Sequence, residues 1–290
     1  MKSVKFFYAI LLFLSVSLSA QAVKRFTLWQ LPSQINTIGN SYVFRTDKGR
    51  IVVMDGGVRE EASYLRGFLA ALGNEVEAWI VTHPHFDHVG ALTEILNNPA
   101  GINIKRIYHS PFSHEFCNTE TEYAAEALAY YEAIEKSGVE TVDLFKSGLI
   151  VSVDCLKFKI LSVTDEKLTH NPYNNSSMVV RVWDKYKSFL FLGDLGAEGG
   201  DKLLANVSRK DLDCDYLQVA HHGQRGVRES FYKTIKFSAC LWPTPSWVYN
   251  NDIGGGFNTH TLETVYTRKW MDEIGIKTHY KSFDGLTKIE

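Results

Sequence analysis

The stretch WIVTHPHFDHVGAL, residues 79–92, decides how the rest of this 290-residue chain is interpreted. Three histidines and one aspartate fall within six positions, after an apolar run typical of a strand and before a segment with helical spacing. Alternate side chains of an extended turn point the same way, so His83 and His85 are expected to converge on one metal ion. Asp87 and His88 follow a bend and are expected to face a second ion. Imidazole and carboxylate are ordinary zinc ligands and also suit iron.

Residues of the same chemical types stand at the ends of three other predicted strands. Asp55 ends IVVMD, Asp194 ends FLFLGD, and DYLQVAHHG brings His221 and His222 to the end of a third. Each acid alone is equally well explained as a turn residue or a helix cap. A histidine-rich turn without metal is also a known structure. Together, however, the histidine turn and the three strand ends predict one metal centre.

The chain begins with a segment typical of a secretory signal peptide, residues 1–22. Two lysines precede an apolar stretch, which small residues follow, so cleavage is expected before Val23. The alternative is a membrane anchor, but the apolar run is short for a span of about 20 residues. The mature chain, residues 23–290, is expected to be exported, to a periplasm or out of the cell, with no stable membrane association. Its length suits one large α/β domain.

Charge and cysteine content limit the classes of partner and metal site. The formal net charge is −2, and it becomes −4 when the two lysines of residues 1–22 are removed, so global basicity does not indicate nucleic acid. The cysteines form no CxxC pair, which argues against a thiolate zinc site. Cys155 and Cys240 lie in strand-like runs and are interpreted as buried thiols. The sequence selects no disulfide pairing among Cys117, Cys155, Cys214 and Cys240.

Periodicity predicts two β-rich halves, each interleaved with helices. This order favours two packed sheets with helices outside them over one doubly wound parallel sheet. One helix, at residues 119–138, is expected to begin with a threonine cap and an acidic first turn. Strands are expected at 41–46, 50–57, 77–83, 102–110, 215–223, 238–242, 277–283 and 286–290, with a β-rich stretch at 149–163 and a hairpin-like pair of strands at 176–194. Further helices are expected at 59–73, 89–98, 227–236 and 261–275.

These motifs resemble those of the metallo-β-lactamase-fold hydrolases over nearly all of residues 23–290. Asp55 in VMDGG is similar to the first motif of that superfamily, the HxHxDH turn to the second, and Asp194 to its bridging aspartate. The resemblance implies an α/β fold, a four-layer αββα sandwich with the metal site at one edge between the sheets. The implied cofactor is zinc, as two ions, with manganese or iron as alternatives. Two later segments, NNSSMVVRVWDKYKSFLFLGDLGAEGGDKLL and DYLQVAHHGQRG, resemble more closely the globular domain of ComEC-type competence proteins, which act in DNA uptake.

The chain departs from the superfamily at its third motif, which usually supplies a histidine. That region reads THNPYNNSSMVV, so His170, Asn174 or Asn175 stands where a ligand is expected. Asp55 is expected to hold a ligand histidine, or the geometry of the glycine loop, rather than an ion. His222 and His260 are alternatives to His221 as a ligand. The expected metal ligands are His83, His85, Asp87, His88, Asp194 and His221, and the candidate catalytic residues are Asp87, His222 and His260.

We expect an exported metal-dependent hydrolase, a phosphodiesterase or nuclease that uses a metal-activated hydroxide, because paired ions can stabilise both the attacking and the leaving oxygen. The substrate is then a small-molecule or nucleic-acid phosphodiester.

The aromatic stretch WPTPSWVY is a candidate base-stacking surface, or else buried packing. The alternatives are a lactone, β-lactam or thioester hydrolase, and a non-catalytic binding protein with a degenerate metal site. A basic rim after the last histidine pair supports a phosphate-bearing substrate, or is a solvated helix face: Arg225, Arg228, Lys233 and Lys236.

Overall fold

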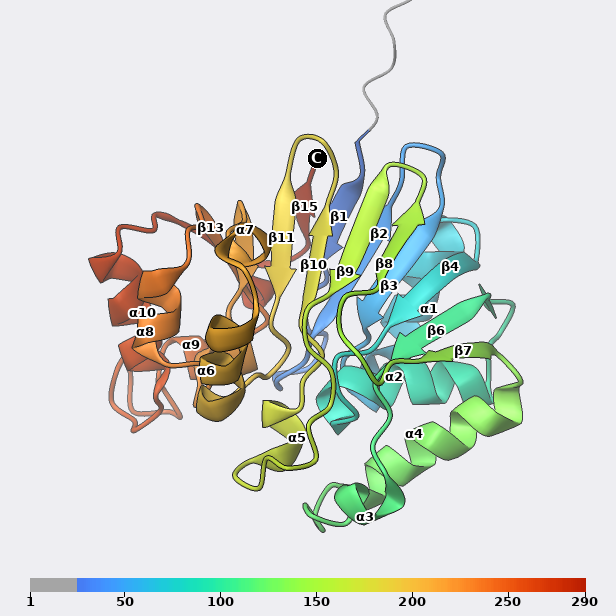
Figure 1. Cartoon of the computed structure of the whole chain (residues 1–290), viewed down its shortest axis with the longest axis horizontal. Coiled ribbons are helices and arrows are strands. Elements are labelled where there is room, and N and C mark those ends of the chain that lie inside the picture. The colour runs from blue at the N-terminus through green and yellow to red at the C-terminus, as the bar shows by residue number, and fades with distance from the viewer. Residues whose placement is uncertain (1–24) are drawn as a thin grey trace, which may run out of the picture.

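Two β-sheets face each other in the computed structural model, which describes residues 25–290 (Figure 1). The predicted signal peptide lies outside the described residues. The first sheet has the strand order β15-β1-β2-β3-β4-β6-β7, with β5 beside β4. Its strands are β1 (Thr27–Gln30), β2 (Ser41–Arg45), β3 (Ile51–Asp55), β4 (Glu75–Ile80), β5 (Asn103–Ile104), β6 (Arg106–His109), β7 (Glu140–Asp143) and β15 (Thr287–Ile289).

The second sheet has the order β14-β13-β12-β11-β10-β9-β8. Strands β8 to β11 pair antiparallel, whereas β11 to β14 pair parallel. Its strands are β8 (Ile150–Val153), β9 (Leu156–Ile160), β10 (Val180–Trp183), β11 (Ser188–Phe191), β12 (Tyr216–Gln218), β13 (Ala239–Trp242) and β14 (Thr278–Lys281).

The main core lies between the sheets. It forms because successive side chains of a strand point to opposite faces of the sheet. On β2, Tyr42 and Phe44 point into this core, whereas Val43 between them joins the cluster under the outer helices. The ring of Phe44 meets that of Phe191 from the second sheet edge-on, with centroids 5.7 Å apart. Because both faces of each sheet are covered, strands such as β3 and β13 are buried along their whole length.

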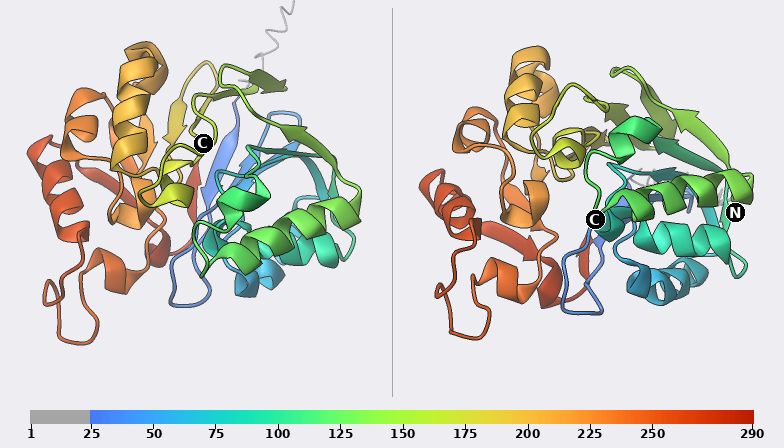
Figure 2. Two further views of the ribbon diagram at one scale, coloured as in Figure 1. Left: turned by 60° about the horizontal axis from the view of Figure 1, so that its bottom comes forward. Right: turned by 90° about the horizontal axis from the view of Figure 1, so that it is seen from below.

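Helices cover the outer face of each sheet, which gives four layers (Figure 2). The predicted αββα sandwich is therefore confirmed. Over the first sheet lie α1 (Ala62–Ala71), α2 (Phe86–Asn97) and α4 (Ala124–Ser137), and over the second lie α6 (Ala197–Asn206), α8 (Glu229–Thr234) and α10 (Thr264–Glu273). The shorter helical segments are η1 (Arg59–Glu61), α3 (His114–Cys117), α5 (Pro172–Asn175), α7 (Arg209–Leu212), η2 (Ala220–Gly223), α9 (Ser246–Tyr249) and η3 (Ser282–Asp284).

Glycine at one position lets α2 approach the loop after β3 closely. A Cβ atom built on Gly90 would lie 2.5 Å from the backbone nitrogen of Arg59 and 2.9 Å from the carbonyl carbon of Val58. Any side chain there would push α2 away from this loop. Because α2 begins inside the histidine turn, the glycine helps to set the position of Asp87 and His88.

Three local predictions were wrong. The helix expected at 119–138 begins at Ala124 without a side-chain cap, because Thr119 donates its hydroxyl to the Phe116 carbonyl instead. The strand expected at 102–110 is split into β5 and β6. Cys155 lies in the turn between β8 and β9 and is only half-buried, whereas Cys240 is buried as expected, and all four cysteines are free. Within residues 25–290, no helix is long and apolar enough to cross a membrane.

Candidate metal centre

Four strand ends bring the histidine and aspartate side chains to one edge of the sandwich. Strand β3 ends at Asp55, and its parallel neighbour β4 leads into the histidine turn and α2. In the second sheet, Asp194 follows β11, and His221 and His222 follow its parallel neighbour β12. Neighbouring parallel strands end at the same edge of a sheet. Residues far apart in sequence therefore meet at this edge, such as Asp55 and His222, which are 167 positions apart.

Four buried residues form the larger of two possible metal-binding groups: Asp87, His88, Asp194 and His222. Nε2 of His222 lies 2.9 Å from Oδ2 of Asp87 and 3.1 Å from Oδ2 of Asp194. Nε2 of His88 lies 3.2 Å from Oδ1 of Asp194. These close pairs lack hydrogen-bond geometry, so one atom of each residue is buried without a hydrogen-bond partner: Asp87 Oδ2, His88 Nε2, Asp194 Oδ1 and His222 Nε2. Orphaned polar atoms are costly to bury, and a divalent cation would satisfy all four, so these residues fit a metal ion.

His83, His85 and Asp194 form the second group. Nε2 of His83 lies 3.0 Å from Nδ1 of His85, so these two ring nitrogens converge. Asp194 belongs to both groups, which places its carboxylate between the two possible ion positions. The described residues thus offer two overlapping groups of possible metal ligands that share one aspartate.

The ring nitrogen of His88 that faces away from the centre is held by a carboxylate. Nδ1 of His88 lies 2.8 Å from Oδ2 of Asp55, and both side chains are fully buried. Asp55 also accepts hydrogen bonds from the amide of Asn40 at 2.8 Å and from the backbone and hydroxyl of Thr82 at 2.8 and 2.9 Å. Its carboxylate therefore orients the His88 ring and leaves Nε2 free to face the centre, as ligand histidines require.

Two of the other three histidines in these groups are also oriented by an oxygen acceptor. Nδ1 of His222 lies 2.6 Å from the carbonyl oxygen of Pro243. Nε2 of His85 lies 3.1 Å from Oε2 of Glu120. Sequence reasoning missed Glu120, which it assigned to the start of a helix. No local signal marks this residue, because its partner is 35 positions away and only the fold brings them together.

The charges of the metal-free centre are strongly coupled. Burial raises the pKa of Asp87, but the nearby His88 and His222 outweigh it and hold that pKa below its usual range. The pKa of Asp194 is lowered for the same reason. Burial opposes a charge on His222, but Asp194 and Asp87 outweigh it and raise the pKa of His222 to about 10. The pKa of His88 is also raised, against its burial, by Asp194, Asp55 and Asp87.

The geometry separates the adjacent histidines His221 and His222. Both adopt left-handed backbone angles, with φ of 51° and 53°. His222 joins the four-residue group, whereas Nε2 of His221 lies 3.8 Å from Oδ2 of Asp194 and 3.4 Å from the amide nitrogen of Asn174. The sequence favoured His221 as the ligand, but the distances favour His222. Burial lowers the pKa of His221, which therefore stays neutral at pH 7.

His260 is not brought to the centre. Within the described residues it is in neither metal-binding group and does not line the cavity above them. Its backbone nitrogen donates to the Asn251 carbonyl at 3.0 Å, and its own carbonyl accepts from the Asn251 amide at 2.7 Å. These contacts fix His260 as part of the loop that precedes α10.

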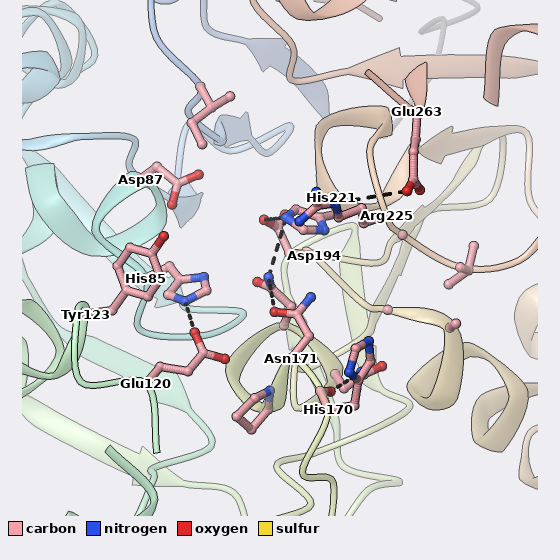
Figure 3. A pocket seen from close by; sticks show the side chains of 18 of the residues that line it. His85, Asp87, Glu120, Tyr123, His170, Asn171, Asp194, His221, Arg225 and Glu263 are labelled. Atoms are coloured by element: carbon pink, nitrogen blue, oxygen red, sulfur yellow. Dashed lines mark hydrogen bonds and ion pairs between the residues drawn. The ribbon is translucent and has the colours of Figure 1, made fainter. Parts of the chain in front are cut away.

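An open cavity of about 840 Å³ lies over the centre (Figure 3). Figure 3 shows His221, Arg225 and Glu263 on one side of it and His85, Glu120 and Tyr123 on the other. Arg225 and Arg228 line the cavity, but Lys233 and Lys236 do not, so only half of the expected basic rim faces it. Trp242 is fully buried in the core and cannot stack on a base, whereas Trp270 lines the cavity instead.

Comparisons with known proteins agree with this architecture. The chain belongs to the metallo-β-lactamase superfamily, since the family description "Metallo-beta-lactamase superfamily" matches residues 36–227, more than half of it. It is similar to the metallo-beta-lactamase fold protein YhfI from Bacillus subtilis, with 12% identity, a TM-score of 0.54, and coverage of 92% of this chain and 100% of that one. This likeness shows the shared fold.

Two further solved structures are similar at lower TM-scores. One is a diphosphatase from the PhnP family, with 13% identity, a TM-score of 0.46, and coverage of 92% and 98% of the two chains. The other is Zn(2+)-bound PqqB from Methylobacterium extorquens, with 11% identity, a TM-score of 0.49, and coverage of 87% of each chain. A search of curated proteins finds no match. The family match and the geometry of the centre together describe a hydrolase-like member of the superfamily with a His/Asp cluster suited to divalent metal.

Proposed function

We propose that this protein is an exported metal-dependent phosphodiesterase, acting on a small-molecule or nucleic-acid phosphodiester. One observation carries the proposal: two arginines face a cavity whose floor is the His/Asp cluster. Guanidinium groups match the geometry of phosphate oxygens. The ComEC-like segments of the sequence and the signal-peptide pattern of residues 1–22 support DNA-related substrates and export.

Zinc is the proposed metal, and when bound it would act as a Lewis acid and lower the pKa of a coordinated water toward about 7. The proposed ligands are His83 and His85 at one position, Asp87, His88 and His222 at the other, and Asp194 between them. Asp55 and Glu120 orient the ligand histidines through the hydrogen bonds described above.

His221 replaces His260 as the candidate hydrogen-bond donor to the leaving oxygen. Its neutral ring lines the cavity beside Asp194, where an N–H group can stabilise the negative charge that develops on that oxygen. His222 is assigned to the metal, because its Nε2 lies between the two aspartates.

Arg225 is the better placed of the two arginines to bind phosphate. Its side chain is 78% exposed and lies 4.0 Å from Glu263, a pair worth little in water. Arg228 is held by Asp201 at 3.0 Å, so its charge is partly compensated. An anionic substrate can therefore recruit Arg225 without first breaking a strong ion pair.

The test is hydrolysis of bis-p-nitrophenyl phosphate and of single-stranded DNA by the mature chain loaded with zinc or manganese. Asp87→Asn is expected to abolish turnover, because it removes a charged ligand with little change of shape. Arg225→Gln is expected to raise KM with little change in kcat, whereas Lys236→Gln, a matched loss of charge outside the cavity, should change neither.

Other results would reject this proposal. If the protein hydrolyses a lactone, β-lactam or thioester but no phosphodiester, the metal centre serves the hydrolysis of that other bond. Protein that holds metal but hydrolyses none of these compounds would support a binding protein. Export is tested separately, by determining the N-terminal residue of the protein recovered outside the cytoplasm, which is expected to be Val23.

A further inference from the structure

We infer that the two metal positions are unequal: Asp87, His88, Asp194 and His222 hold a tightly bound ion, and Asn174 completes a weak, exchangeable position at His83, His85 and Asp194. The inference rests on the metal site of the proposed function, but not on its substrate. It concerns the position where the sequence lacks the expected histidine of the third motif.

The segment around α5 wraps the pair His83 and His85. The ring of Tyr173 stacks on that of His85, with centroids 5.0 Å apart and planes at 27°. The hydroxyl of Ser177 lies 3.4 Å from Nδ1 of His83. Asn174 lies between Tyr173 and Ser177 in sequence and lines the same cavity as His85 and Asp194.

Two of the three sequence candidates for that ligand are excluded by their contacts. The side chain of Asn175 is fully used, because its amide nitrogen donates to the His170 carbonyl at 2.7 Å and its oxygen accepts from the Gly199 backbone at 2.9 Å. His170 is exposed, and the structure shows no contact of its ring with the centre. Asn174 remains.

Asn174 has the required free atom. Its amide nitrogen donates to Oδ1 of Asn171 at 2.9 Å, which fixes the orientation of the amide. Its Oδ1 is buried and has no hydrogen-bond partner. The residue is only 4% exposed, so water does not easily satisfy this oxygen. A cation beside His83 and His85 would do so.

The donor sets of the two positions predict different affinities. The four-residue group offers two imidazoles and two carboxylates, whereas the other offers two imidazoles, a neutral amide oxygen and a carboxylate shared with the first ion. A neutral amide oxygen is a weaker zinc ligand than imidazole, and oxygen ligands suit harder ions such as manganese. The weak position should therefore exchange its ion readily and accept manganese.

The test counts metal ions, independently of turnover. Metal-free mature protein is titrated with zinc in a calorimeter, and its zinc content is measured after gel filtration in metal-free buffer. We expect about one ion to be retained, and a second ion to bind at least about 10-fold more weakly. Two ions retained with equal affinity would overturn the inference, and so would the absence of any bound ion, which would also reject the metal site itself.

Three variants test whether Asn174 is the additional ligand of the weak position. Asn174→His is expected to retain two ions after gel filtration, because it restores an imidazole. Asn174→Ala is expected to weaken the second ion further and leave the first unchanged. His170→Ala is the matched control on the same loop and should change neither. Loss of the second ion in His170→Ala, or an unaltered second ion in both Asn174 variants, would overturn the assignment. These measurements count bound metal ions and do not depend on whether the protein is a phosphodiesterase.

Discussion

Asp55 accepts the Nδ1 proton of His88 over 2.8 Å, in a pair from which water is fully excluded. Asp55 sits at the end of β3 with a left-handed φ of 54°, and His88 lies one strand away in the first turn of α2. The pair therefore links the backbone of the first sheet to the metal-facing nitrogen of a ligand histidine.

Asp55→Asn should lower zinc affinity by about 10- to 100-fold, the usual effect of losing a partner that orients a ligand. Asp143→Asn is a matched control, because Asp143 holds His109 at 2.9 Å in a similar pair outside the centre. Competition with a chelator measures both variants. Equal affinities in Asp55→Asn and the parent protein would show that Asp55 does not orient His88 for metal binding.

Zinc binding to the metal-free protein should release protons at pH 7. Burial disfavours the charged form of His222, but Asp194 and Asp87 outweigh it and raise its pKa to about 10, and that of His88 is raised as well. Both rings therefore carry a proton that ligation must displace, and zinc affinity should increase with pH. Calorimetry in buffers of different ionisation enthalpy counts the protons, and an enthalpy independent of the buffer would contradict the prediction.

The metal-free protein should lose stability in alkaline solution. A histidine whose pKa is raised on folding stabilises the protein fully below about pH 6.5, and this contribution is lost as the pH rises through the folded-state pKa, about 10 for His222. Urea unfolding of the metal-free protein should thus need less denaturant at alkaline than at neutral pH. The zinc-loaded protein is the control, because histidines that bind zinc have already lost this proton. An equal loss of stability in both forms would point to other groups.

His221→Ala should reduce turnover without removing metal, and His260→Ala should change neither. If His221 donates a hydrogen bond to the leaving oxygen, the loss is expected to reach about 100-fold with a dinucleotide, whose leaving alkoxide carries a localised charge. It should be smaller with bis-p-nitrophenyl phosphate, whose leaving group spreads its charge over the ring. Equal losses with the two substrates would assign His221 to substrate binding rather than to the leaving oxygen.

Gly90→Ala should destabilise the protein by about 1–3 kcal/mol, because the new methyl group meets the backbone of Val58 and Arg59. Gly67→Ala is the matched control on α1, where a Cβ atom meets nothing within 4 Å. That substitution should stabilise the helix by up to about 1 kcal/mol. Urea denaturation of the two variants measures the difference, and a neutral Gly90→Ala would mean that α2 can shift freely.

The layer order and the convergence of the main motifs could be predicted from sequence. Apolar runs and turn residues predict the strands of the two sheets. The spacing of His83, His85, Asp87 and His88 predicts that these four side chains converge, because that spacing sets their local geometry. Asp55 and Asp194 could be found since each ends a recognisable strand. These features share one property: the signal lies within a few residues of the feature itself.

The remaining parts of the site depend on contacts between distant segments. Two consecutive left-handed backbone conformations, at His221 and His222, decide which of the two rings faces the centre. The identity of these residues does not predict that conformation. Glu120 reaches His85 only through the fold. His260 precedes a helix, as expected, but the Asn251 contacts keep it in its loop. Whether a basic residue faces the cavity likewise depends on tertiary packing, so sequence reasoning could not separate Arg225 from Lys233.

The orienting carboxylates have a further consequence for the electrostatics of the cavity floor. Asp55, Asp87, Asp194 and Glu120 all lie within hydrogen-bond or ion-pair distance of a histidine of the centre. With neutral histidines, one divalent cation would leave this floor with a net negative charge, which repels an anion. A second divalent cation would balance these four carboxylates, so that the floor would no longer repel an anion that approaches Arg225. Occupancy of the weaker position would thus act as an electrostatic gate that admits anionic substrates only when metal is plentiful.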